Sequence, residues 1–76
     1  MQEATRAAVR SLGDVVRKER LRLALSQEDF AEQCDVHRTY VGQIERGEKN
    51  VSIESILKIA ASLDLKPSQL FARARL

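Results

Sequence analysis

The most constraining feature of this chain is its middle stretch, residues 27–47, which reads QEDFAEQCDVHRTYVGQIERG. Phe30 and Cys34 lie four positions apart in its first half, and Val41 and Ile44 lie three apart in its second half. Since residues three or four apart share one face of a helix, each half predicts a short helix with one buried side. The polar side chains of the second helix are left free.

The two helices must be joined by a tight turn at Asp35, where a residue with positive φ is usual. Gly is common at such a position, but Asp tolerates the left-handed region better than most residues do. Ser26 is a suitable N-cap for the first helix, and Gly47 stands where glycine commonly ends a helix. We therefore predict helices over residues 27–34 and 37–46.

Size and composition limit what the rest of the chain can do. Its 76 residues suit one domain, whose core is marginal alone, so oligomerisation would help it. An apolar share of 43% with three Gly and one Pro favours helices with short connections. Two Phe, one Tyr and no Trp argue against an aromatic platform for single-stranded nucleic acid. A net charge of +2 does not establish nucleic-acid binding, so the positions of the charges must carry that inference.

Several function classes lack support in the sequence. Cys34 is the only cysteine, which excludes a disulfide framework and a cysteine-based metal cluster and fits a reducing cytoplasm. No apolar run approaches the roughly 18 residues of a membrane span, and the N-terminal MQEATRAAVR lacks the apolar part of a signal peptide. There is no nucleophile–base set and no Gly-rich phosphate loop. We expect no enzyme activity, no cofactor, no metal and no membrane partner.

Three further helices are predicted outside the central pair, which makes the fold class all-α with five helices. The first runs from about residue 5 to residue 23, with a stripe formed by Val9, Leu12, Val16 and Leu23 at helical spacing. The second covers residues 52–63 behind a Ser52 cap. Its expected core face consists of Ile53, Ile56, Leu57, Ala60 and Leu63. The third covers residues 67–73, and Pro67 suits its first position.

The central stretch resembles the helix-turn-helix of the Xre/Cro–phage repressor family. The matching features are the Ser-Gln opening, Ala31, the apolar Val36, Val41 and Ile44, and the closing Ile-Glu-Arg-Gly. The run HRTYVGQIERGEKNVSIESILKIAASLDLKPSQLF is similar to one subgroup, the small controller proteins of restriction–modification systems. The resemblance covers roughly residues 12 to 71. It implies a lambda-repressor-like domain that binds double-stranded DNA as a homodimer and regulates its own restriction–modification operon.

The opening residues of a recognition helix reach base edges, since such a helix enters the major groove with its N-terminus first. Here these residues are Arg38, Thr39 and, one turn on, Gln43. Arg can fork onto guanine O6 and N7, Gln can pair with adenine, and Thr can offer a methyl or a hydroxyl. For Arg38 a phosphate contact, for Thr39 a local cap and for Gln43 a solvated position remain as alternatives.

Contacts to the DNA backbone are expected around both ends of the helix pair. Gln27 matches the glutamine with which the family clamps phosphate. Four further residues match subgroup positions that touch phosphate or reach toward bases: Tyr40, Arg46, Lys49 and Asn50. Tyr40 could instead be a packing residue and Arg46 a partner of the helix dipole. His37, just before the recognition helix, is a cap or a phosphate neighbour.

Arg20 falls on the apolar stripe of the first helix, where a charge needs a partner. The family resemblance implies that this partner is Glu45, near the end of the recognition helix. The alternative is a surface arginine whose stem lies along the core.

One short helix reads too few bases for genomic specificity, and a dimer on two half-sites related by two-fold symmetry solves this. To form such a dimer the chain needs a self-complementary apolar patch. The candidates around the last two helices, where relatives dimerise, are Ile56, Ile59, Leu63, Leu65 and Phe71. Some of them must belong to the chain's own core, so only a subset can face a partner. RNA polymerase is a further expected partner, which the bound dimer would activate or block according to where the operator lies.

Two alternatives to the controller role stay open. One is a general Xre-family repressor or the antitoxin of a toxin–antitoxin pair, which gene neighbourhood would distinguish. The other is a helical protein-interaction module that has lost DNA binding, against which Gln27, Arg38, Thr39 and Lys49 argue.

Overall fold

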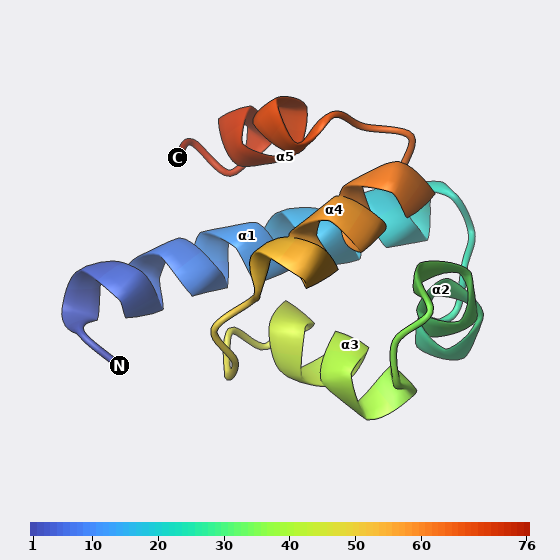
Figure 1. The fold of residues 1–76 in the computed structure, drawn as a ribbon, viewed down its shortest axis with the longest axis horizontal. Coiled ribbons are helices and arrows are strands. Elements are labelled where there is room, and N and C mark those ends of the chain that lie inside the picture. Colours follow the sequence, from blue (N-terminus) through green and yellow to red (C-terminus); the bar gives the residue numbers. More distant parts are fainter.

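The computed structural model describes all residues from 1 to 76, and it contains five helices and no strand (Figure 1). The helices are α1 at Glu3–Arg22, α2 at Gln27–Cys34, α3 at Arg38–Glu45, α4 at Ile53–Ser62 and α5 at Pro67–Arg73. The predicted all-α class is confirmed. The observed α3 and α4 lack one residue at each end of their predicted ranges. His37 and Ser52 are N-caps whose side chains accept backbone N–H groups, and Arg46 and Leu63 are the C-caps.

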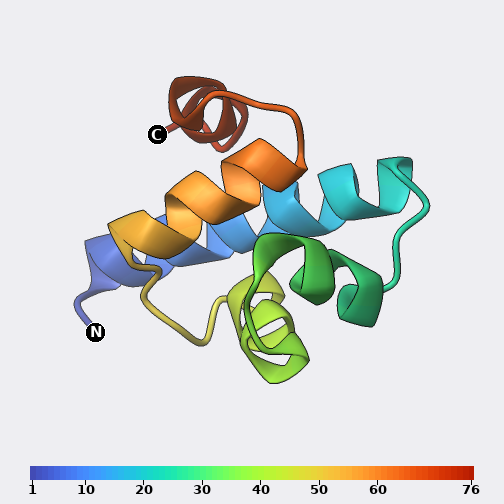
Figure 2. The same cartoon turned by 45° about the vertical axis from the view of Figure 1, so that its right-hand side comes forward.

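The helices stack in three levels around α1 and α4. α5 packs on α1 and α4 from one side, while α3 packs on α1 and α2 packs on α4 from the other (Figures 1 and 2). The outer surface of the α2–α3 pair and the C-terminus therefore lie at opposite ends of the molecule (Figure 1). None of the five helices has both the length and the apolar character needed to cross a bilayer.

A single apolar core lies between these levels. Its largest fully enclosed side chains include Phe30 from α2, Ile44 from α3, Ile59 from α4 and Leu70 from α5. Cys34 is part of this core, and burial raises the pKa of its thiol, which favours the protonated form.

The buried face of α4 differs from the predicted one. Ile53 and Leu57, expected in the core, are 69% and 53% exposed. Ile56, Ala60 and Leu63 are buried as predicted, and Ile59, outside the predicted face, is only 1% exposed. Apolar residues occupy more than one side of this helix, so periodicity alone did not distinguish the side that packs on α2 and α5 from the one that faces solvent.

The crossing of α1 over α3 requires a glycine. A Cβ at Gly13 would overlap the carbonyl oxygen of Ile44 and would lie 3.2 Å from the carbonyl carbon of Glu45. The backbone of α1 can therefore lie directly on the last turn of α3, which holds α3 against the body of the molecule.

Candidate nucleic-acid interface

The turn between α2 and α3 is held by Asp35 in the left-handed conformation, with φ of 56° and ψ of 47°. The predicted positive φ at this residue is confirmed. The following backbone N–H, that of Val36, donates to the carbonyl of Ala31 at 3.0 Å. Val36 then packs against the core, and the chain leaves the turn in the direction that starts α3.

Both helices of the pair begin with a side-chain cap. The hydroxyl of Ser26 accepts the N–H of Asp29 at 3.0 Å, and Nδ1 of His37 accepts the N–H of Thr39 at 3.0 Å. The cap role anticipated for His37 is the one the structure shows, and it requires the imidazole proton to be on Nε2. Because His37 satisfies the backbone of Thr39, the exposed side chain of Thr39 remains free.

A polar hollow of about 450 Å³ lies between the start of α2 and the outer side of α3. It is lined by Gln27, Glu28, Arg38, Thr39, Gly42 and Arg46, with no hydrophobic residue among them. We call it the polar hollow. Its floor is open because residue 42 is glycine: a Cβ there would lie 3.0 Å from Nη1 of Arg46 and 3.6 Å from Oε1 of Gln27.

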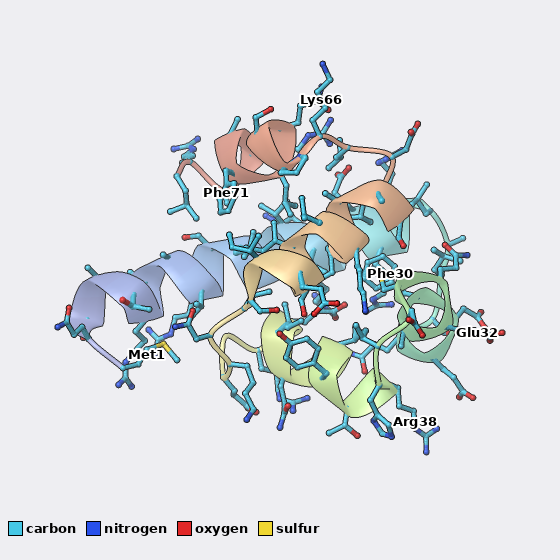
Figure 3. All side chains as sticks on the ribbon, in the orientation of Figure 1. Met1, Phe30, Glu32, Arg38, Lys66 and Phe71 are labelled. Carbon is cyan, nitrogen blue, oxygen red and sulfur yellow. The ribbon has the colours of Figure 1, made fainter.

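The two cations of the polar hollow are each paired with a carboxylate. Nη1 of Arg38 donates to Oε2 of Glu28 at 3.3 Å, between side chains that are 66% and 71% exposed. Arg46 forks onto Glu48 through Nε at 2.8 Å and Nη2 at 3.2 Å. This hydrogen bonding lowers the pKa of Glu48 and raises that of Arg46. Figure 3 shows Arg38 projecting away from the body of the molecule at the start of α3.

Gln27 is tied to the buried ion pair that the family resemblance implied. Nε and Nη2 of Arg20 donate to Glu45 at 2.7 and 3.0 Å, between side chains only 8% and 2% exposed. This hydrogen bonding raises the pKa of the Arg20 guanidinium. Nε2 of Gln27 donates to the same carboxylate at 3.1 Å. An amide nitrogen has two hydrogens, so the second remains available to an acceptor outside the chain.

The other residues predicted to contact DNA do not line the polar hollow. Tyr40 is half-buried and packs against the core, as its packing alternative expected, and Gln43 is half-buried too. Lys49 and Asn50 are exposed in the connection between α3 and α4, and Asn50 borders an apolar groove beside α1 and α5. Of the nine predicted DNA contacts, the polar hollow therefore unites Gln27, Arg38, Thr39 and Arg46.

Two residues of the polar hollow were not identified from the sequence. The ten-residue separation of Glu28 from Arg38 gives no local signal of their contact. Gly42 could have been found, since a glycine inside a helix is costly and commonly marks a close approach.

The candidate dimer residues are also placed differently from the prediction. Ile56, Ile59 and Leu63 belong to the chain's own core and are only 6%, 1% and 1% exposed, which corrects their assignment to the interface. Leu65 and Phe71 are half-buried and pack against that core. The large exposed apolar residues of α4 are Ile53 and Leu57, four positions apart on one side of the helix. We call them the α4 stripe.

Comparison with known proteins identifies the family to which the chain belongs. Residues 16–70 match the Helix-turn-helix family. The chain is 48% identical over 59 residues to the control protein C.BamHI of Bacillus amyloliquefaciens, covering 76% of this chain and 73% of that protein.

Solved structures agree with the sequence relatives. The restriction–modification controller protein C.AhdI from Aeromonas hydrophila superposes with a TM-score of 0.80 and 43% identity, over 83% of this chain and 96% of that one. The controller protein C.Esp1396I, solved as a tetramer in complex with its natural 35 base-pair operator, gives a TM-score of 0.81 at 29% identity over 90% of each chain.

Proposed function

This chain belongs to the helix-turn-helix family and is a DNA-binding regulator, and we propose that it acts as the controller protein of a restriction–modification system. The observation that carries the proposal is the polar hollow, where a glutamine amide and two arginines open outward beside the start of α3. Together with its controller relatives, this arrangement favours a regulator that reads duplex DNA over an enzyme or a protein-interaction module.

In the proposed complex α3 enters the major groove with its N-terminus first. Arg38 forks onto guanine O6 and N7, Thr39 contacts the neighbouring base, and Gln43 reaches the groove one turn later. Gln27 and Arg46 bind phosphate on either side of Gly42, which sets the register without reading sequence. Lys49, Asn50 and His37 add contacts to the DNA backbone at the ends of α3.

We propose that the protein binds as a homodimer. An eight-residue α3 reads too few base pairs for genomic specificity, and two-fold related half-sites double the sequence that is read. The α4 stripe supplies exposed apolar surface for the partner, with Leu65 and Phe71 beside the core as further candidates. The operator complex of C.Esp1396I, which contains a tetramer, supports assembly on DNA in this family.

The proposed regulation needs no chemistry and no cofactor. A dimer bound upstream of its own gene would recruit or block RNA polymerase according to the position and occupancy of its sites. Protein concentration is then the input signal, and the cytoplasm is the place of action.

The test is fluorescence anisotropy with a duplex from immediately upstream of the protein's own coding sequence and a scrambled duplex, across a salt series. We expect a preference of about 10³-fold or more for the upstream duplex. Arg38→Ala should remove about 1–3 kcal/mol of that discrimination, since one bidentate base contact is lost.

The matched control is Arg75→Ala, which removes the same charge from an exposed residue at the end of the chain opposite α3 (Figure 1). It should leave the preference unchanged. Equal, weak binding of both duplexes with a steep salt slope would mean that the basic surface only contacts phosphate. Autoregulation through that upstream DNA would then be wrong.

A further inference from the structure

Glu28 is placed where an acidic residue should hinder DNA binding. It lines the polar hollow that we assign to the DNA, together with Gln27 and both arginines. Its side chain is 71% exposed, so its charge is not needed to hold the fold. A phosphate that binds beside Arg38 in the polar hollow would meet this carboxylate, and two like charges in contact repel.

The contact between Glu28 and Arg38 leaves the useful part of the guanidinium free. Glu28 accepts from Nη1 alone, and Arg38 makes no other hydrogen bond or ion pair. Arginine has five N–H donors in a planar fork, so the edge formed by Nε and Nη2 is still available to two acceptors. Guanine offers two such acceptors, O6 and N7, in the major groove.

The ion pair of Arg46 with Glu48 differs in geometry from that of Arg38 with Glu28. Glu48 occupies the Nε–Nη2 edge of Arg46 and lies outside the polar hollow, beside Arg6 and Arg10 of α1. Nη1 of Arg46 is left facing Gly42, where one donor suits a phosphate oxygen. Of the two carboxylates, therefore, only Glu28 both contacts a base-reading candidate and lines the surface that the DNA would occupy.

We propose that Glu28 is a specificity-determining residue of this interface. Glu28 orients Arg38 toward guanine and disfavours the binding of Arg38 to phosphate. On non-specific DNA the carboxylate repels the backbone and competes for Arg38. On the operator it restricts the guanidinium while the free edge binds the base, so less side-chain freedom is lost on binding. The inference rests on the proposed DNA-binding function and adds a positioning residue to it.

The test compares Glu28→Gln with the wild type on two duplexes: one enriched by the wild type from a random-sequence pool and one scrambled. Affinity for the scrambled duplex should rise about threefold to fivefold, as expected for one exposed charge contact. The slope of log affinity against log salt should steepen by about 0.9 as one more phosphate contact forms. Affinity for the enriched duplex should fall about threefold, so that selectivity drops by about tenfold.

Glu32→Gln is the matched control, because it removes the same charge from the same helix one turn later. Glu32 is exposed and forms no ion pair, and it does not line the polar hollow but borders a separate one with Asp29 and Gln33. It should change affinity for both duplexes by equal factors and leave selectivity unaltered. In an Arg38→Ala background, Glu28→Gln should no longer change selectivity.

Each outcome has one meaning. If Glu28→Gln and Glu32→Gln behave alike, or if Glu28→Gln tightens both duplexes equally, the role of Glu28 is only net charge and the inference is overturned. If the wild type enriches no sequence from the pool, the proposed function fails, whatever the variants do. Thermal unfolding of both variants checks that the fold is unchanged.

Discussion

Ala24 adopts the left-handed conformation at the exit of α1, with φ of 58°. Asp35 does the same at the exit of α2, with φ of 56°. Asp tolerates this region, whereas the Cβ of alanine crowds the following carbonyl and costs roughly 1–2 kcal/mol. The chain therefore retains at Ala24 a local strain that it reduces at the recognition turn by using Asp.

Replacing Ala24 by glycine should therefore stabilise the protein. Glycine removes the left-handed strain, but it also makes the unfolded chain more flexible, which costs roughly 0.4–1 kcal/mol of stability. Because the strain is the larger of the two, we expect the free energy of unfolding to rise by about 0.5–1 kcal/mol. Urea denaturation monitored by circular dichroism measures it. Ala61→Gly, at an exposed helical position of α4, is the control and should destabilise by about 0.5–1 kcal/mol. Loss of stability in both variants would contradict the strain at Ala24.

At the scale of the helices, the position of α3 depends on its contact with α1. Gly13 allows close approach of the two backbones, and the buried pair of Arg20 with Glu45 joins the same helices near the end of α3. Through Glu45 this joint also reaches Gln27 at the start of α2. The surface that we assign to DNA is thus positioned by contacts on the inner side of the helix pair.

Gly13→Ala should separate α1 from α3, because the added methyl would overlap the backbone of Ile44. We expect a loss of about 1–3 kcal/mol in the free energy of unfolding, typical of an overpacked contact. Chemical denaturation provides the measurement, with the exposed neighbour Ser11→Ala as control. A Gly13→Ala protein as stable as the Ser11→Ala protein would show that the crossing has room to spare.

At the scale of the whole molecule, the polar hollow and the α4 stripe have different surroundings and different proposed partners. The polar hollow is lined by charged and amide side chains, whereas Ile53 and Leu57 expose apolar surface in a chain whose small core benefits from association. Their exposure also means that they can be changed without opening the core.

Leu57→Glu should weaken the proposed homodimer while the protomer stays folded. A buried charge at the centre of an interface commonly costs 2 kcal/mol or more, so the dissociation constant should rise by about 30-fold or more. Sedimentation equilibrium measures it, and circular dichroism checks the fold. Leu21→Glu changes an equally exposed leucine on α1 and should leave the assembly intact. Identical dissociation constants for the two variants would exclude the α4 stripe as the dimer surface.

Local rules were enough to predict much of this protein from its sequence. The N-caps at Ser26 and Ser52, the left-handed Asp35 and the period of the apolar residues depend on neighbours a few positions away. For that reason the five helices lie within about two residues of their predicted ends. The contact of Arg20 with Glu45 spans 25 positions, and only the family resemblance indicated it.

The tertiary structure alone decided which of several local possibilities is realised. α4 has apolar residues on two sides, and packing on α2 and α5 buries Ile59 while leaving Leu57 in solvent. Glu28 meets Arg38 only because the turn folds α3 back beside the start of α2. Such contacts depend on the relative placement of helices, which periodicity and capping do not encode, since each describes one helix at a time.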